Sequence, residues 1–152
     1  MSPDTYLFAL RLLSRRELSE KQVRQRLARD GHDTASIEVA VSRLKANRSI
    51  DDLRVATLIA RRETAVRRRG KLRVRQQIEA AGISPVIAAQ AVDEAFADLD
   101  PDALLGAALD KRLHGRDQIA DDREFQRLYR YLMGQGFESD TIIRALEARR
   151  RK

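Results

Sequence analysis

A pattern of apolar residues around a glycine occurs three times in this chain of 152 residues. In each copy two apolar residues lie eight and four positions before the glycine, and two more lie six and ten positions after it. The glycines are Gly31, Gly82 and Gly136, which are 51 and 54 residues apart. The apolar residues of this ladder are Val23, Leu27, Ile37, Val41, Val74, Ile78, Ala88, Val92, Leu128, Leu132, Ile142 and Leu146. Such a period predicts tandem units, each of which buries its apolar face against its neighbours.

The spacing of the apolar residues is helical almost throughout, because they recur at three and four positions with little alternation. Each of the three prolines follows a residue that commonly caps a helix, at Ser2-Pro3, Ser84-Pro85 and Asp100-Pro101. These pairs predict three helix starts. The three repeated glycines predict helix ends, since glycine adopts the left-handed conformation without a side-chain clash.

Other polar residues predict further helix starts. Ser19 and Gln22 have the spacing of a capping box, and Asp33 or Thr34 is placed to cap the helix that follows Gly31. Ser139 or Asp140 is placed to do the same after Gly136.

These starts and ends predict an all-α fold, an elongated, curved array of three tandem three-helix repeats. The predicted repeats are 1–48, 49–100 and 101–152. The predicted helices are 5–15, 19–30, 34–47, 51–68, 71–81, 85–98, 101–113, 121–135 and 139–150. Only 114–120 is predicted to be a longer loop.

The composition favours an acidic partner. Thirty Lys and Arg against 23 Asp and Glu give a net charge of +7 and a pI near 10.3, as is typical of proteins that bind nucleic acid. The chain has no cysteine, which excludes disulfides, thiolate zinc sites and a thiol nucleophile and favours a reducing compartment. Neither a signal peptide nor an apolar run of membrane-spanning length, about 18 residues, is present, so we expect a cytoplasmic protein with no membrane contact.

Catalytic chemistry is not expected. His32 and His114 are the only histidines and lie far apart in the sequence. The carboxylate pairs Asp51-Asp52 and Asp121-Asp122 each open a predicted helix, where acids bind free backbone amides and favour the helix dipole. No nucleophile, base and orienting group occur in a recognisable pattern. We therefore expect no catalytic residue, no metal, no cofactor and no enzyme activity.

The basic residues are the candidate binding residues. The stretch 61–75 contains eight Arg and Lys with only Glu63 opposing them, and helical spacing would place Arg61, Arg68 and Arg75 on one stripe seven residues apart. The alternative interpretation of this run is a solvated face. The acidic stretch 93–102 is either a set of helix caps or a second patch for a basic partner. The predicted partner-binding residues are Arg24, Arg61, Arg67, Arg68, Arg69, Lys71, Arg73, Arg75, Arg127 and Arg130.

The chain also resembles a known family. The segments that carry the resemblance are Ser14-Arg15-Arg16-Glu17-Leu18, Ser49-Ile50-Asp51-Asp52 with Ala56, Gly70 to Ile83, and Leu132 to Phe137. In this order and spacing they resemble the RecX family of recombinase regulators over nearly the whole chain. Gln135 departs from the family pattern, in which a basic residue often precedes the last glycine.

The resemblance implies a bent array of three-helix repeats that binds in the groove of the RecA filament on single-stranded DNA. It also implies restraint of ATP hydrolysis and strand exchange, in the setting of DNA recombination, DNA repair and the SOS response. Contact with the DNA would be direct or through the filament, and we expect a monomer. Whether filament extension is blocked or disassembly is promoted stays open.

Two other function classes remain open. A stand-alone DNA-binding protein, using a helix-turn-helix pair such as 19–30 and 34–47, explains the charge but not the threefold repeat. A scaffold that binds only protein explains the repeat but not the arginines.

Overall fold

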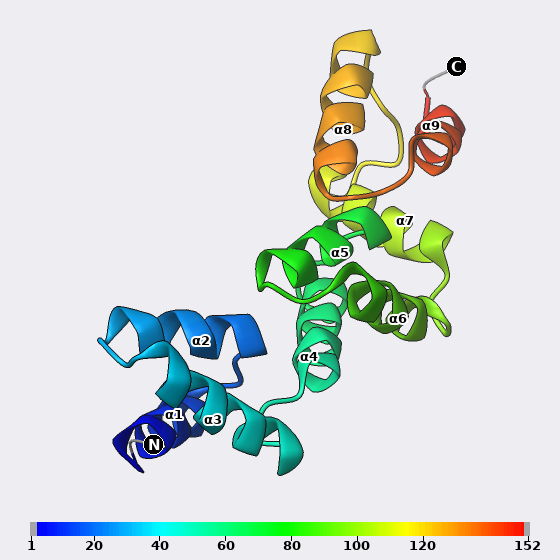
Figure 1. Cartoon of the computed structure of the whole chain (residues 1–152). Helices are drawn as coiled ribbons and strands as arrows, with labels where there is room; N and C mark the ends of the chain where they lie inside the picture. The colour runs from blue at the N-terminus through cyan, green and yellow to red at the C-terminus, as the bar shows by residue number, and fades with distance from the viewer. Residues whose placement is uncertain (1–2, 151–152) are drawn as a thin grey trace.

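The computed structural model describes residues 3–150, and that span contains nine α-helices (Figure 1). They are α1 Pro3–Arg15, α2 Glu20–Arg29, α3 Thr34–Ala46, α4 Asp52–Ala65, α5 Lys71–Ala80, α6 Pro85–Phe96, α7 Pro101–Leu113, α8 Asp122–Gly134 and α9 Ser139–Ala148. The only strand-like pairing within this span is one β-bridge between Ile119 and Arg150. The predicted all-α fold is confirmed. Ser2, predicted to precede the first helix, and the basic residues Arg151 and Lys152 lie outside the described residues.

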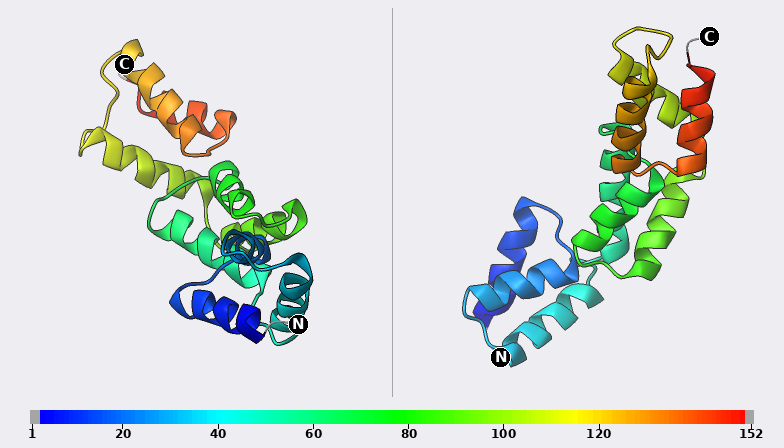
Figure 2. Two further views of the ribbon diagram at one scale, coloured as in Figure 1. Left: turned by 60° about the vertical axis from the view of Figure 1, so that its left-hand side comes forward. Right: turned by 90° about the horizontal axis from the view of Figure 1, so that it is seen from above.

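The helices form three successive modules, α1–α3, α4–α6 and α7–α9, each with its own apolar core. All twelve positions of the apolar ladder are buried, and none is more than 7% exposed. Figures 1 and 2 show the modules one after another along a bent path, with the two ends of the chain at opposite ends of the molecule. The repeat read from the sequence therefore corresponds to three separate cores in an elongated array.

Most predicted helix ends are confirmed. Gly31, Gly82 and Gly136 have φ of +91°, +84° and +95°, the left-handed conformation expected after a helix. The Ser19 capping box is present, and Asp33, Ser84, Asp100, Asp51 and Asp121 cap their helices through side-chain oxygens. The cap predicted at Ser139 or Asp140 is wrong, because Glu138 is the N-cap of α9 and Ser139 is already helical. The Ser139 hydroxyl instead lies 2.8 Å from the hydroxyl of Tyr129.

The predicted helix 51–68 is too long at its C-terminal end. α4 ends at Ala65, and Arg68 has a left-handed backbone with φ of +52°. The backbone amide of Arg69 then donates to the carbonyl of Glu63, which turns the chain toward α5. Arg67, Arg68 and Arg69 therefore lie in a connection rather than on a helix, and the predicted helical stripe Arg61–Arg68–Arg75 is wrong.

The same kind of contact joins neighbouring modules at both joints. At the second joint the start of α5 contacts the glycine turn between α8 and α9: the Gly70 amide donates to the Gln135 carbonyl at 2.8 Å and the Leu72 amide to the Gly136 carbonyl at 3.2 Å. A Cβ at Gly70 would lie 2.5 Å from the Gly136 oxygen. The turn of the third module thus binds amides at the start of α5, which has no side-chain cap of its own.

At the first joint the start of α2 contacts the glycine turn between α5 and α6. The Ser19 hydroxyl donates to the Ala81 carbonyl at 2.5 Å, and the side chain of Lys21 lies against Gly82. The Glu20 amide donates to Asp52 Oδ1 of the next module at 2.8 Å. Asp52 is the first residue of α4, but its carboxylate accepts a hydrogen bond from the start of α2 across the joint.

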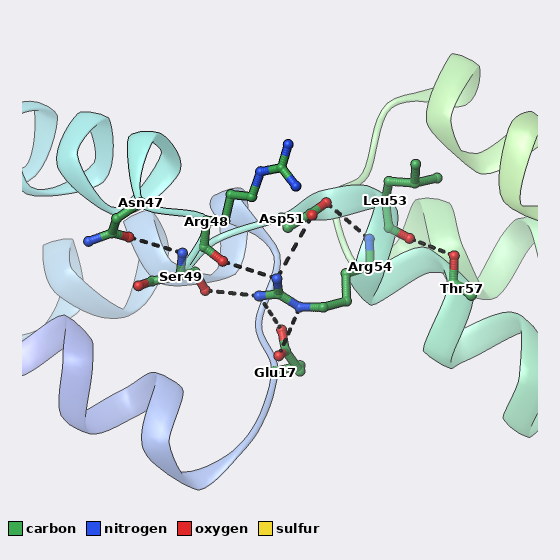
Figure 3. A network of polar contacts seen from close by, with 8 residues as sticks. All are labelled: Glu17, Asn47, Arg48, Ser49, Asp51, Leu53, Arg54 and Thr57. Carbon is green, nitrogen blue, oxygen red and sulfur yellow. Dashed lines mark hydrogen bonds and ion pairs between the residues drawn. The ribbon is translucent and has the colours of Figure 1, made fainter.

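Arg54 makes further contacts at the first joint (Figure 3). Its guanidinium donates to both carboxylate oxygens of Glu17, at 3.1 and 3.2 Å, and to the carbonyls of Arg48 and Ser49, at 3.0 and 3.2 Å. It thereby ties the α1–α2 connection to the start of α4. Glu17, Asp51 and Asp52 belong to the segments that carry the family resemblance, and all three build this joint.

Candidate partner-binding surface

Five of the ten predicted binding residues are exposed and have no ion-pair partner among residues 3–150. They are Arg61, Arg68, Lys71, Arg127 and Arg130. Lys71 lies over the ring of Phe96, with its Nζ 5.7 Å from the ring centroid. Because none of them forms an ion pair within this span, these five side chains are the candidates for binding an acidic partner.

Two other predicted binding residues are neutralised inside their own module. Arg24 forms ion pairs with Glu38 at 2.8 Å and with Glu20 at 3.0 Å, and the hydrogen bond to Glu38 is the main cause of its raised pKa. Burial acts to raise the pKa of Glu20, but the hydrogen bonds from Lys45 and Arg24 outweigh it, so the pKa is lowered. Arg75 pairs with Glu79 on the same helix at 3.2 Å.

Glu63 forms ion pairs with two arginines in the middle of the basic run. Its side chain is 1% exposed, and its carboxylate lies 3.2 Å from Arg69 Nη1 and 3.9 Å from Arg67 Nη1. Arg69 is only 16% exposed, whereas Arg67 is 52% exposed. Arg69 therefore serves mainly to neutralise a buried carboxylate, while Arg67 stays accessible to a partner.

Arg73 has a structural position in the second joint. A Cβ at Gly136 would overlap its backbone nitrogen and Cβ and lie 2.8 Å from its Cα. The contact brings the start of α5 to the C-terminal end of α8, the helix that carries Arg127 and Arg130 (Figure 1). Lys71, at the start of α5, therefore lies at this joint, whereas Arg24 lies in the first module.

A groove of about 590 Å³ lies at the first joint and contains two arginines that the predicted set omitted, Arg16 and Arg62. Arg16 comes from the α1–α2 connection and Arg62 from α4. Both are exposed, and neither has an ion-pair partner in the described part of the chain. Arg62 belongs to the basic run and Arg16 to the segment Ser14–Leu18, but only the packing of the modules brings them to one groove.

The two histidines lie in separate modules of the described structure. Residues 3–150 contain no cluster of three or more His, Asp or Glu side chains that could hold a metal ion. His32 Nδ1 lies 2.8 Å from the Thr5 hydroxyl and its ring stacks on Phe8, while His114 ends α7 in a left-handed conformation. Over the same residues, no helix is both long and apolar enough to cross a membrane.

The acidic stretch 93–102 has structural roles at its C-terminal end. Asp100 caps α7 by accepting from the Asp102 amide at 3.0 Å, and Asp102 pairs with Arg144 of α9 at 3.2 Å. The capping interpretation therefore accounts for Asp100, whereas the Asp102 carboxylate forms an ion pair within the third module.

The fold and the surface together define a class of protein, a modular helical array with exposed arginines and a groove between its modules. Residues 6–44 match the first three-helix domain of RecX, and residues 100–146 match the third. "Regulatory protein RecX" of Acidithiobacillus ferrooxidans is 35% identical over 151 residues, which cover 98% of this chain and 93% of that protein. The protein of the same name from Syntrophotalea carbinolica is 33% identical over 141 residues and 92% of each chain. The chain belongs to the RecX family of regulatory proteins.

Two solved structures show the same fold. A crystal structure of regulatory protein RecX aligns with a TM-score of 0.75 at 21% identity, over 95% of this chain and 70% of that one. RecX from Lactobacillus salivarius aligns with a TM-score of 0.73 at 20% identity, over 95% of each chain. The family resemblance seen in the sequence motifs is thus confirmed, as is the helical repeat fold.

Proposed function

We propose that this protein binds the RecA filament on single-stranded DNA and modulates its ATP hydrolysis and strand exchange. Membership of the RecX family over nearly the whole chain supports this partner. The observation that carries the binding mode is the set of exposed cations without internal partners, Arg61, Arg68, Lys71, Arg127 and Arg130. A basic surface of this kind suits an acidic nucleoprotein filament.

The modular shape supports a mechanism without catalysis. A bent array of similar modules can contact neighbouring subunits of a helical filament at the same time. A ligand that binds one filament state more tightly than another shifts the equilibrium toward that state. Slower ATP hydrolysis then requires no active site, metal or cofactor in the regulator.

We also propose the bounds of the units, the state of the protein and its contact with DNA. The units are 1–48, 49–100 and 101–152, the protein acts as a cytoplasmic monomer, and DNA is contacted directly or through the filament. Arg24, Arg67, Arg69, Arg73 and Arg75 stay in the proposed binding set, but their internal contacts give them a smaller share of the binding than the five free cations.

The test is a double variant, Arg61→Ala with Arg68→Ala, because neither side chain has an ion-pair partner in residues 3–150 and the fold should be unchanged. Inhibition of the RecA ATPase on single-stranded DNA should weaken about tenfold or more. Two charged contacts of about 1 kcal/mol each together exceed the roughly 1.4 kcal/mol that corresponds to a tenfold change in affinity. The matched control is Lys111→Ala with Arg123→Ala, which removes the same charge from exposed sites of the third module. Equal inhibition by the two double variants would contradict the assignment of the basic run.

Direct DNA contact is tested with the same proteins. If Arg61 and Arg68 bind phosphates, the salt dependence of binding to bare single-stranded DNA should flatten by about one to two units in the first double variant. If they bind acidic surfaces of the recombinase, inhibition should weaken while binding to bare DNA is unchanged. A parent protein that binds DNA equally well with and without recombinase, and leaves the ATPase unaffected, would favour the stand-alone DNA-binding function.

A further inference from the structure

The groove at the first joint is built from both of the modules that meet there. Arg16 lies in the α1–α2 connection, Gln22 on α2, Leu58 and Arg62 on α4, and Gln77 on α5. Its volume of about 590 Å³ is in the range of pockets that hold a ligand or several side chains of a partner. Its shape therefore depends on how the first two modules are held together.

The polar groups that line the groove are mainly donors. Arg16 and Arg62 contribute two charges without internal partners among residues 3–150. The side-chain oxygen of Gln22 already accepts from the Ser19 amide, so Gln22 offers the groove its N–H groups. The one lining carboxylate, Glu17, is bound through both oxygens to Arg54. An occupant must accordingly supply acceptors, and anionic ones fit best.

The groove also has an apolar side. Leu58 is 44% exposed, and Ile59 and the buried Val55 also line the groove. None of the lining residues is aromatic, so the groove lacks the rings on which single-stranded DNA bases stack. Apolar surface beside free arginines is complementary to a protein segment that carries both an apolar side chain and a carboxylate.

We propose that the groove at the first joint binds an acidic, apolar-anchored segment of the protein partner, with Arg16 and Arg62 pairing its carboxylates and Leu58 contacting its apolar side chain. The identity of the partner as the recombinase filament rests on the proposed function. The groove contact uses Arg62 of the basic run but none of the five cations assigned above to the acidic filament, Arg61, Arg68, Lys71, Arg127 and Arg130. Because both modules line the groove, an occupant would bind best when the Arg54–Glu17 contact holds the joint closed.

The experiment measures binding of full-length protein to recombinase filaments on single-stranded DNA, to recombinase without DNA, and to bare single-stranded DNA. Arg16→Ala with Arg62→Ala should lower affinity for the filament and for DNA-free recombinase at least tenfold, and change affinity for bare DNA less than twofold. Leu58→Ser should lower filament affinity at least threefold without changing the net charge. Lys111→Ala with Arg123→Ala is the control for charge and should stay within twofold of the parent.

Circular dichroism of each variant checks that the helical fold is retained, as expected because neither arginine has an ion-pair partner in the described span. If the parent binds the filament and Arg16→Ala with Arg62→Ala binds equally well, the groove proposal is overturned while the proposed function stands. If the double variant loses bare DNA and filament binding in parallel, the groove binds nucleic acid and the proposal is likewise overturned. If the parent binds no recombinase in any form, the proposed function fails and the partner named here fails with it.

Discussion

Two glycine turns with the same backbone conformation allow the energy of the second joint to be measured. Gly136 and Gly31 have φ of +95° and +91°, so alanine at either site incurs the same left-handed strain, about 1–2 kcal/mol. At Gly31 a Cβ would have no atom within 4 Å, whereas at Gly136 it would overlap the backbone of Arg73. Gly31→Ala is thus a matched control in which the joint is untouched.

Relief of the overlap requires α5 to move away from the turn between α8 and α9. The two backbone hydrogen bonds of the joint, from Gly70 and Leu72, would then be lost, at about 0.5–1.5 kcal/mol each. Adding the shared strain, we expect Gly136→Ala to lower the free energy of unfolding by about 2–5 kcal/mol, against about 1–2 kcal/mol for Gly31→Ala.

Urea denaturation followed by circular dichroism would give the two free energies, and hydrogen exchange would report on the joint itself. The amides of Gly70 and Leu72 should exchange faster in Gly136→Ala and at the parent rate in Gly31→Ala. Equal destabilisation by the two substitutions, with unchanged exchange at Leu72, would refute the argument that this turn holds the second and third modules together.

Two further predictions concern charged side chains. Arg69→Ala should lower the free energy of unfolding by about 3 kcal/mol, because it leaves the buried Glu63 carboxylate largely uncompensated. The control Arg68→Ala should change this free energy by less than about 0.5 kcal/mol. Similar values for the two variants in urea denaturation would contradict the assigned role of Glu63. The pKa of Glu124 lies below its ordinary value of 4.5, first because Arg116 donates to the carboxylate and second because the Ala120 amide does so. A folded-state pKa below the unfolded one gives stability that is present above the unfolded pKa and is lost as pH falls through the folded pKa. Glu124→Gln should therefore lose less stability than the parent between about pH 5 and pH 3, which parallel acid titrations of helix content would show.

The parts of the fold that depend on local sequence were predictable. The apolar ladder identified twelve buried residues, four in each module, and glycine, proline and cap residues located most helix ends within a few positions. These signals lie within one turn or one helix face, so no knowledge of tertiary contacts was needed. The over-long helix 51–68 shows the limit, because the left-handed backbone of Arg68 and the hydrogen bond from the Arg69 amide to the Glu63 carbonyl have no local signal in the sequence.

The joints and the candidate binding surface were not predictable in the same way. The sequence showed a dense run of arginines but not which of them have internal partners. Arg24 lies 14 residues from its partner Glu38, and Arg54 lies 37 residues from Glu17. The opposite error concerns Arg16. It was omitted from the predicted binding residues, but the packing of the first joint places it in the same groove as Arg62. Both errors have one cause, because charge density is a local property and charge compensation depends on the packed structure.

The last module differs from the first two in one respect: within the described residues, no amide at the start of its second helix donates to another module. At both joints an amide at the start of that helix donates to an acceptor in the next module, Asp52 for α2 and the Gln135 carbonyl for α5. In α8 the module supplies its own acceptors: Asp121 accepts from the Glu124 amide at 2.8 Å, and Glu124 accepts from the Ala120 amide at 3.0 Å and from Arg116. The start of α8 is thus satisfied from within its own module, and the groove at the first joint and the free arginines are the surfaces proposed for a partner.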